Sequence, residues 1–210
     1  MAFLFDASNL RQNNYLHEPV VFENIISPEM CDALVAAKTS FEKENGGIQV
    51  AEEGRREEYF EDPKIRVVDT YSFDWEDEGL PDIVFDLYTE LEAIVTSANE
   101  DYDFDLVGIC ETVNFLHYHT NTGMRQTGHY VGHTDFGPEF LSTRKLTTII
   151  QLTDGNEYEG CTLNLPDWGD APREKGSAIV FPSYMYHKVS RITKGERHCL
   201  NLWSHGPAFR

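Results

Sequence analysis

The chain has 210 residues, the length of a single domain, and its 36 acidic and 17 basic residues give a formal net charge of −19 at pH 7. A surface this acidic argues against nucleic acid and anionic membranes as partners, because phosphate groups bind basic surfaces. In its simplest interpretation the charge serves solubility. The alternative is that it attracts a basic peptide or protein substrate.

The cysteines and the N-terminus indicate the cellular compartment. Cys31, Cys110, Cys161 and Cys199 are widely spaced, which argues against a zinc ribbon or a disulfide scaffold and fits a reducing compartment. The N-terminus lacks the basic region of a signal peptide, and no run approaches the roughly 20 apolar residues that a membrane span needs. We therefore expect a cytoplasmic protein, and the sequence leaves its oligomeric state open.

Two helices are expected in the first half of the chain. Ser27 and Pro28 are typical of a helix cap and a first helical residue, and Gly46-Gly47 is the expected end of this helix. Leu80-Pro81 opens a second, longer helix with apolar residues at helical spacing, namely Ile83, Val84, Leu87, Leu91 and Ile94. Both helices are expected to support a sheet from outside rather than to form a separate domain.

The other N-terminal segments are expected to form strands and one long loop. Residues 1–26 are interpreted as a leader followed by a strand around Val20–Phe22, and Ile65–Phe73 as a further strand. Residues 51–64 are charged and have no clear period. They are interpreted as a solvated loop, with a mobile flap over the active site as the alternative.

From Phe104 onward, short β-type runs alternate with turn residues, the pattern of a sandwich or a barrel. Residues 1–103 are therefore expected to be a helix-containing support and residues 104–205 the β core, together forming one domain over residues 1–210. The expected strands of the core are Leu106–His119, His129–Asp135, Leu146–Leu152, Cys161–Leu165, Ser177–Phe181, Tyr186–Ile192 and Arg197–Ser204.

His133 and Asp135 stand two residues apart and suggest a metal site. Residues i and i+2 of a strand point to the same face, roughly 6.5–7 Å apart, so both side chains could reach one metal ion from one strand. His187 would then arrive from a second strand. Two histidines and one carboxylate are the ligand set of a non-haem Fe(II) site that keeps coordination positions open for chemistry.

Arg197 adds an anion-binding group to this set. Lys194-Gly195 is a turn signal, so we expect the chain to pass through His187, reverse, and return with Arg197 beside the metal. A guanidinium there could hold a carboxylate with two parallel hydrogen bonds. A metal with open positions beside such a clamp suits a chelating keto-acid such as 2-oxoglutarate.

Several segments of the C-terminal half resemble one enzyme family. The PKHD-type hydroxylases, which belong to the prolyl-4-hydroxylase-like Fe(II)/2-oxoglutarate dioxygenases, are similar over residues 110–205. The similarity is carried by Tyr158-Glu159-Gly160 to Leu163, Phe181-Pro182-Ser183, His187-Lys188-Val189, Thr193, Gly195-Glu196-Arg197, Trp203 and the aromatic-x-x-His-x-Asp segment Tyr130–Asp135.

The resemblance implies a mainly β fold with flanking helices, in which a double-stranded β-helix (jelly roll) carries iron inside one open end. It also implies that His133, Asp135 and His187 bind the iron and that Arg197 binds 2-oxoglutarate. The sequence departs from the family at Cys161, where a second glycine is usual, and in the segment Tyr118–Tyr130, which is longer than usual. No catalytic residue is expected beyond the metal ligands.

Further candidates would line the same cavity. Alternation along the last strand places Asn201 and Trp203 on the face of Arg197. Asn201 could hydrogen-bond a metal-bound water or oxygen. Trp203 could wall the substrate pocket, or it could be a core residue that seals the barrel.

Two tyrosines and one glutamine are candidates for contact with 2-oxoglutarate. Tyr118 is preferred over Tyr130, because Tyr130 lies three residues before His133 and would face away from the metal unless a bulge intervenes. Gln151 stands where some relatives carry another co-substrate tyrosine, and a buried amide must find partners. The other histidines, His17, His117, His119, His129, His198 and His205, are interpreted as surface or packed residues.

The implied cofactors are Fe(II), 2-oxoglutarate and O2, with ascorbate as a further candidate. The implied reaction hydroxylates a prolyl or other side chain in a peptide or protein and releases succinate and CO2. The acidic chain would suit a basic target. The alternatives are the same chemistry on a free amino acid or small molecule, a non-catalytic metal-binding jelly roll, and a Zn(II) hydrolase, which would leave Arg197 unexplained.

Overall fold

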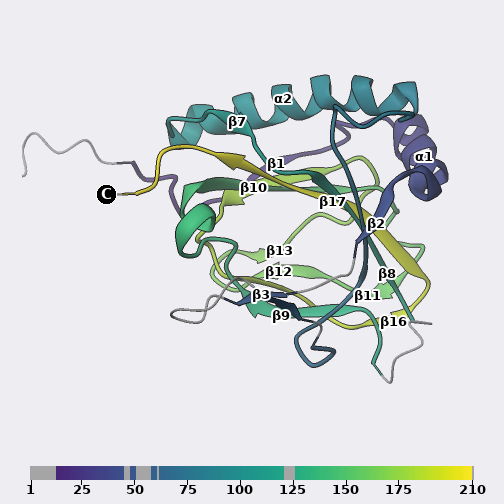
Figure 1. Ribbon diagram of the computed structural model, residues 1–210. Coiled ribbons are helices and arrows are strands. Elements are labelled where there is room, and N and C mark those ends of the chain that lie inside the picture. Colours follow the sequence, from purple (N-terminus) through teal and green to yellow (C-terminus); the bar gives the residue numbers. More distant parts are fainter. Residues whose placement is uncertain (1–12, 45–47, 51–57, 61, 121–125, 210) are drawn as a thin grey trace, which may run out of the picture.

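A computed structural model describes residues 13–44, 48–50, 58–60, 62–120 and 126–209. Two antiparallel sheets lie face to face, and two α-helices lie along the outer face of the larger sheet (Figure 1). This is the mainly β jelly roll with supporting helices that the sequence predicts. No helix in the described part of the chain is long and apolar enough to cross a membrane.

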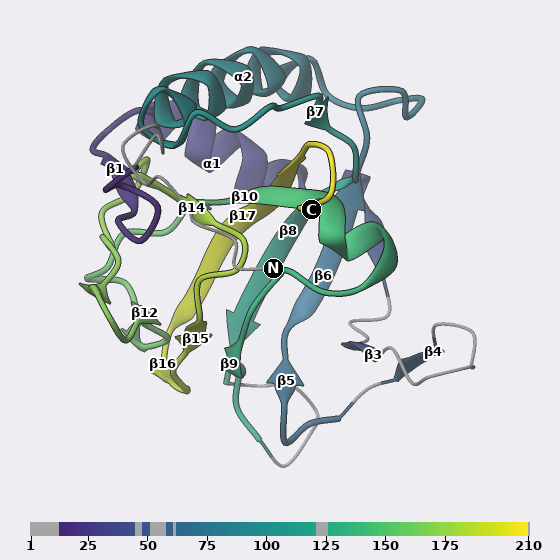
Figure 2. The same ribbon diagram turned by 90° about the vertical axis from the view of Figure 1, so that its left-hand side faces the viewer.

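The larger sheet runs through most of the long strands. Its pairings are all antiparallel, and β7 (Gly108–Ile109) joins it by pairing with β17. In spatial order the strands are β1 (Val20–Phe22), β14 (Ala178–Pro182), β10 (Arg144–Gln151), β17 (Glu196–His205), β8 (Val113–His119), β6 (Asp69–Phe73) and β2 (Glu42–Glu44). Figure 2 shows β17, β8 and β6 side by side beneath α2.

The smaller sheet faces the larger one and holds shorter strands. Its order is β13 (Gly169–Asp170), β12 (Leu163–Leu165), β15 (His187–Val189), β9 (His129–His133) and β5 (Arg66–Val67). Four strands form two separate two-stranded sheets, in which β11 (Glu159–Gly160) pairs with β16 (Ile192–Lys194), and β3 (Ile48–Val50) pairs with β4 (Glu58–Phe60). Short 3-10 helices, η2 and η3, cover Lys38–Ser40 and Glu139–Thr143.

The first helix begins as predicted and ends early. α1 spans Pro28–Ala37, and the Ser27 hydroxyl accepts the N–H of Met30 at 3.1 Å. The expected end at Gly46-Gly47 is wrong, because the chain leaves the helix through η2, and those glycines lie outside the described residues. Phe41, within the expected helix, is extended instead, and the centroid of its ring lies 4.6 Å from that of Phe73 in the core.

The second helix follows the prediction. α2 spans Asp82–Tyr102 and begins after Pro81. Its buried face contains four of the apolar residues expected there, Val84, Leu87, Leu91 and Ile94. This face packs on the larger sheet as part of one hydrophobic cluster, so the helix supports the sheet from outside.

Two segments differ from their predictions. Ile65–Phe73 is not one strand, because the chain crosses at Val68 from β5 in the smaller sheet to β6 in the larger one. The chain does not reverse direction at Val68, so no turn residue in the sequence marks the change of sheet. Within the expected loop 51–64, β4 pairs with β3 as a ladder. Residues 51–57 and 61 lie outside the described residues, and the flap alternative falls largely on them.

Strand alternation divides the core into two layers. Phe115 of β8 packs in the cluster between the larger sheet and the helices. Its neighbours Leu116 and Tyr118 point the other way, into the cluster between the two sheets. Even-numbered residues of β8 therefore face the gap between the sheets, and odd-numbered residues face the helix side.

Candidate active site

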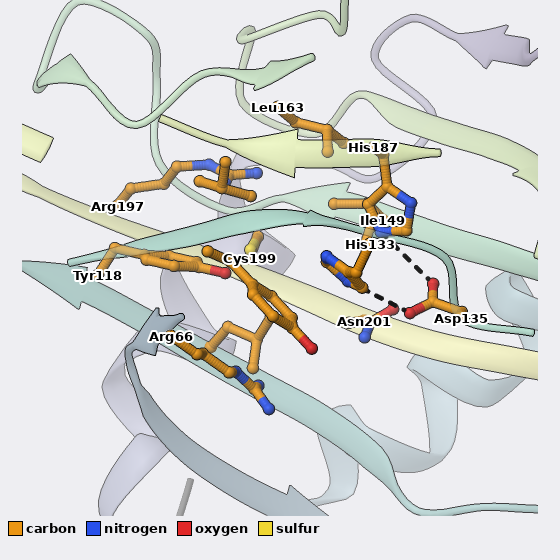
Figure 3. Close-up of a pocket in the computed structure, with 13 residues that line it drawn as sticks. Arg66, Tyr118, His133, Asp135, Ile149, Leu163, His187, Arg197, Cys199 and Asn201 are labelled. Atoms are coloured by element: carbon orange, nitrogen blue, oxygen red, sulfur yellow. Dashed lines mark ion pairs between the residues drawn. The ribbon is translucent and has the colours of Figure 1, made fainter. Parts of the chain in front are cut away.

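Three potential metal ligands meet between the sheets. His133 is the last residue of β9 and pairs in register with His187, the first residue of β15. The Asp135 carboxylate reaches both rings, with Oδ1 3.5 Å from His133 Nε2 and Oδ2 3.6 Å from His187 Nε2. Figure 3 shows these side chains gathered on one side of a cavity. The three ligand atoms lie within 4.8 Å of one another.

Asp135 reaches this position by a route that the sequence analysis did not foresee. β9 ends at His133, so the expected shared strand over His129–Asp135 is wrong. After the strand the chain bends, and the N–H of Asp135 donates to the carbonyl of Ser183 at 2.9 Å. A backbone contact with the end of β14 therefore positions the carboxylate, rather than alternation along one strand.

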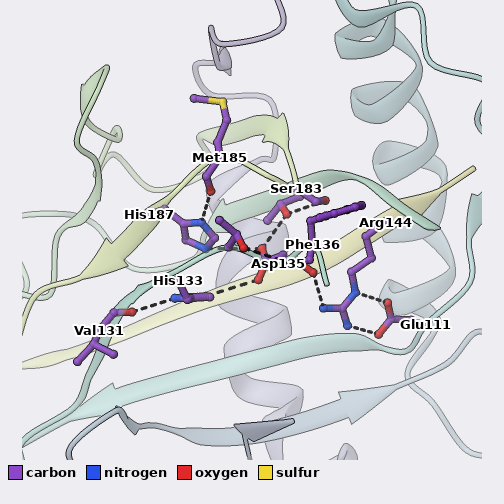
Figure 4. Close-up of polar contacts among 11 residues, drawn as sticks. Glu111, Val131, His133, Asp135, Phe136, Arg144, Ser183, Met185 and His187 are labelled. Carbon is purple, nitrogen blue, oxygen red and sulfur yellow. Dashed lines mark hydrogen bonds and ion pairs between the residues drawn. The ribbon is translucent and has the colours of Figure 1, made fainter. Parts of the chain in front are cut away.

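Both imidazoles present the nitrogen that a metal requires. His133 Nδ1 lies 2.9 Å from the carbonyl oxygen of Val131, and His187 Nδ1 lies 3.0 Å from that of Met185 (Figure 4). A carbonyl oxygen only accepts, so each Nδ1 carries the proton and each Nε2 holds a bare lone pair toward Asp135. This donor set, two neutral imidazole nitrogens and one carboxylate, fits Fe(II) with open coordination positions.

The Asp135 side chain is 8% exposed and ionised. Burial alone would raise the pKa of this carboxyl. The positive charge that the His187 and His133 rings carry when protonated, together with the Thr147 hydroxyl, which donates to Oδ2 at 2.7 Å, outweighs burial and holds the pKa well below its usual range. Thr147 lies on β10, and its hydroxyl oxygen accepts a hydrogen bond from the Ser183 hydroxyl at 3.1 Å, because its own proton goes to Asp135. Thr147 was not among the residues predicted for the site, and no local spacing signals it.

A buried ion pair supports the backbone of Asp135. Arg144 Nη1 donates to the Asp135 carbonyl oxygen at 3.3 Å, while Nε and Nη2 donate to the Glu111 carboxylate (Figure 4). The Arg144 guanidinium also lies 3.5 Å from the centroid of the Trp203 ring. Trp203 therefore packs against Arg144 and is not among the residues that line the cavity. Sequence patterns gave no sign of this pair.

Arg197 approaches the cavity from the side opposite the three ligands (Figure 3). It is 2% exposed, and its Nε and Nη2 donate to Gln151 Oε1 at 2.9 and 2.6 Å. Its Nη1 has no hydrogen-bond partner among the described residues, and no carboxylate in that part of the chain pairs with it. Gln151, expected as a co-substrate contact, therefore binds the arginine and does not line the cavity.

The groups beside Arg197 leave its charge uncompensated. Burial raises the pKa of the Cys161 thiol to about 11 even with the guanidinium beside it, and burial likewise raises the pKa of Cys199 and of Tyr118. All three are neutral at physiological pH. A buried cation without a counter-ion is costly, so this pocket is arranged for an anion from outside the chain.

The path from His187 to Arg197 differs from the expected hairpin. Gly195 turns the chain with a φ of 72° before β17 begins. However, β15 belongs to the smaller sheet and β17 to the larger, so the two strands do not pair. Arg197 consequently faces the ligands across the gap between the sheets.

Both candidate tyrosines line the cavity. The pairing of β15 with β9 is irregular between His187 and Val189, and this bulge lets Tyr130 lie on the cavity side despite its odd spacing from His133. The Tyr130 ring stacks on that of His133 with centroids 3.6 Å apart. The Arg197 guanidinium lies 5.5 Å from the centroid of the Tyr118 ring.

The rest of the lining is mostly apolar. Asn201 also lines the cavity, and its Oδ1 has no partner in the described part of the chain. Arg66, which was not predicted from the sequence, also lines the cavity, and its guanidinium lies 5.0 Å from the centroid of the Tyr130 ring. The apolar lining residues are Leu116, Ile149, Leu163 and Val189.

The departure at Cys161 has a local explanation. Cys161 takes a φ of 50°, in the left-handed region that favours glycine. Its N–H donates to the carbonyl of Arg191 at 3.2 Å, and its side chain is fully buried. The chain thus keeps a glycine-type turn here while the thiol fills space beside Arg197.

Comparison with known families places these residues in context. Residues 113–205 match the model of the 2OG-Fe(II) oxygenase superfamily. This range contains His133, Asp135, His187 and Arg197. No curated protein sequence matches the chain significantly.

Three solved prolyl hydroxylases have a fold similar to that of this chain. The viral collagen prolyl hydroxylase of Paramecium Bursaria Chlorella virus-1, in a 2OG complex, matches with a TM-score of 0.62 and 17% identity, over 90% of this chain and 96% of that one. A Pseudomonas putida prolyl-4-hydroxylase matches with a TM-score of 0.63 and 15% identity, over 91% and 94%. A Trichoplax adhaerens prolyl hydroxylase, in complex with a hypoxia inducible factor peptide fragment, matches with a TM-score of 0.70 and 15% identity, over 91% and 86%. The chain therefore has the fold of the prolyl 4-hydroxylases, and its residues 113–205 are similar to the 2OG-Fe(II) oxygenase superfamily.

Proposed function

We propose that the chain hydroxylates a prolyl or other side chain of a peptide or protein, coupled to the conversion of 2-oxoglutarate and O2 into succinate and CO2. One oxygen atom of O2 enters the substrate as hydroxyl, and the other enters succinate. The observation that carries the proposal is the buried Arg197, which has no carboxylate partner in the described part of the chain and faces His133, Asp135 and His187 across one cavity. Residues 1–210 would act as one domain in this reaction.

In this proposal His133, Asp135 and His187 hold Fe(II), which supplies O2 activation and the oxidative decarboxylation of the keto-acid. Arg197 binds the distal carboxylate of 2-oxoglutarate through charge-assisted hydrogen bonds. Gln151 fixes the guanidinium through Nε and Nη2 and leaves Nη1 for the ligand. The keto-acid end of 2-oxoglutarate would thus face the iron, and its distal carboxylate would face Arg197.

The remaining lining residues orient the co-substrate and exclude water. Leu116, Ile149 and Leu163 give the cavity apolar walls, which strengthen each polar contact inside it. Tyr118 lies beside the Arg197 guanidinium and is placed to donate its hydroxyl to the same carboxylate. Asn201, whose Oδ1 has no partner among the described residues, would hold water near the metal ligands.

A peptide substrate is favoured by two observations. The Trichoplax adhaerens relative in fold holds a peptide fragment, and the viral and Pseudomonas putida relatives are prolyl hydroxylases. The formal net charge of −19 favours a basic peptide, because opposite charge accelerates encounter.

The four cysteines are free thiols, which fits a cytoplasmic location.

The test measures two products in one reaction. The protein is incubated in air with Fe(II), 2-oxoglutarate, ascorbate and a library of basic proline-containing peptides, with the same peptides carrying alanine for proline as controls. The expected result is succinate formation that depends on peptide, together with one added oxygen atom on the proline-containing peptide. The Arg197→Gln protein is expected to lose both products at limiting 2-oxoglutarate. Peptide hydroxylation is contradicted if no peptide stimulates succinate formation, and a free amino acid that does so would support the small-molecule alternative.

A further inference from the structure

A second group of potential metal ligands lies on the opposite face of the larger sheet. Strand alternation turns Glu196 and His198 of β17 away from the cavity that Arg197 faces. His198 pairs in register with His117 of β8, so their side chains meet on the helix side of the sheet. From the sequence alone, both histidines are interpreted as surface or packed residues.

The three side chains form a compact cluster. His117 Nε2 lies 2.9 Å from Glu196 Oε2, and the rings of His117 and His198 stack with centroids 4.3 Å apart. One potential ligand atom from each residue lies within 4.8 Å of the others. A second pair adjoins them, with His119 Nε2 3.0 Å from Asp69 Oδ2.

His198 carries the observation that points to a ligand. Its side chain is 8% exposed, and its Nδ1 lies 3.2 Å from the Thr153 hydroxyl. Its Nε2 is buried and has no hydrogen-bond partner among the described residues. Buried polar atoms are rarely left without a partner, because desolvation is then uncompensated. With the proton on Nδ1 and donated to Thr153, Nε2 offers a bare lone pair, which a metal ion would satisfy.

We propose that His117, Glu196 and His198 bind a divalent transition-metal ion of the Zn(II) type at a second site. Two imidazoles and one carboxylate suit Zn(II), and the exposed position of Glu196 leaves a coordination place for water. Tetrahedral zinc ligands at about 2.0–2.2 Å from the ion lie roughly 3.3–3.6 Å from one another, so binding would move Glu196 Oε2 away from His117 Nε2, 2.9 Å from it without the ion. The Glu196 side chain is 59% exposed and can make this adjustment.

In the metal-free form, Lys38 contacts His117 in a way that competes with metal binding. Lys38 Nζ lies 3.2 Å from His117 Nδ1 and donates to it, because an ammonium group only donates. When Nε2 of a neutral imidazole binds a metal, Nδ1 carries the ring proton, so this contact must break. Removal of the lysine charge therefore favours the ion.

The proposed site is separate from the three ligands between the sheets but shares a strand with the arginine clamp. Arg197 lies between Glu196 and His198 and points to the other face of β17. An ion held by both flanking residues would therefore fix the backbone that carries Arg197. The two sites can be tested independently, since they have no ligand in common.

The test counts Zn(II) ions bound by the metal-free, untagged full chain in isothermal titration. Wild-type protein is expected to bind two ions, and Glu196→Gln one. Glu196→Gln is a conservative change, because the amide oxygen can still accept from His117. Glu159→Gln is the matched control and is expected to retain both ions. Glu159 is an exposed carboxylate that pairs with Lys194 in the separate two-stranded sheet of β11 and β16.

Two further variants make the assignment specific. His198→Asn is expected to lose the same ion as Glu196→Gln, and Lys38→Met is expected to bind that ion more tightly. The experiment is repeated with Asp135→Ala, which is expected to remove the other ion, so failure of the active-site assignment is distinguishable. The second site is contradicted if Glu196→Gln and His198→Asn bind as many ions as wild type, or if Lys38→Met binds no more tightly.

Discussion

Gln151 Oε1 accepts two hydrogen bonds from Arg197, one from Nε at 2.9 Å and one from Nη2 at 2.6 Å. The partner of this fully buried guanidinium is thus an amide and not a carboxylate. An amide fixes the orientation of the group without neutralising it, so the positive charge remains available to a bound anion.

Gln151→Glu is expected to weaken 2-oxoglutarate binding. The new carboxylate would neutralise Arg197 and compete with the co-substrate for it. Loss of a charge-assisted interaction of roughly 1.5–3 kcal/mol corresponds to about a tenfold to hundredfold rise in Kd for 2-oxoglutarate. Isothermal titration of the metal-loaded protein measures this Kd, and metal affinity, measured in the same samples, is expected to stay unchanged. A Kd equal to that of wild type would show that Gln151 has no influence on the clamp.

Thr147→Val is expected to weaken metal binding. The substitution keeps the shape of the side chain but removes the hydroxyl that donates to Asp135 Oδ2 at 2.7 Å. Loss of a hydrogen bond to a ligating group typically costs about 10–100-fold in metal affinity. The matched control is Thr148→Val on the same strand, because the Thr148 hydroxyl is buried and has no partner among the described residues.

Fe(II) affinity of both variants can be measured anaerobically by competition with a chelating dye. The control is expected to bind like wild type. Equal metal affinities for Thr147→Val and Thr148→Val would contradict a supporting role for Thr147.

His198 is expected to make the protein less stable as pH falls below 6.5. Burial, and then the nearby His117 and Lys38, lower the pKa of His198 from 6.5 to about 3 in the folded protein. Between these values the unfolded chain binds more protons, so the free energy of unfolding falls as the pH is lowered, by up to about 1.4 kcal/mol per pH unit. Above pH 6.5 both states are neutral at this residue, and its contribution is constant.

The comparison of wild type with His198→Asn isolates this effect. Urea unfolding in the presence of a chelator, between about pH 6.5 and about pH 4.5, stays above the range in which most carboxylates titrate. The variant is expected to lose stability less steeply than wild type over this interval. Parallel slopes for the two proteins would show that His198 is not held neutral by the fold.

The sequence predicted the central residues of the site because their chemistry is distinctive. His133, Asp135, His187 and Arg197 are the residue types of one metal site with an anion clamp, and the structure brings them to one cavity. The predicted positions of two of them were partly wrong, since Asp135 follows strand β9 and Arg197 lies in the larger sheet, which faces that strand. Spacing along the chain indicates which side chains share a face, whereas it does not indicate which sheet a strand will join.

The supporting residues were not predictable in the same way. Thr147 and Gln151 reach Asp135 and Arg197 only through the position of β10 in the larger sheet. His117 and His198 meet because of one particular register between β8 and β17. Such contacts join residues far apart in the chain, so no local pattern marks them. Phe41 illustrates the same limit for the fold, because it lies outside the expected helix and packs against Phe73, which is distant in the chain.

Absorption spectroscopy without oxygen tests the central claim most directly, that one cavity binds Fe(II) through His133, Asp135 and His187 and 2-oxoglutarate through Arg197. Metal-free protein is mixed with Fe(II) and then titrated with 2-oxoglutarate, for wild type and Arg197→Gln. A visible charge-transfer band is expected only when both ligands are present, and half-saturation of Arg197→Gln is expected to need at least about tenfold more 2-oxoglutarate. Absence of the band in wild type, or equal half-saturation in the two proteins, would contradict the account.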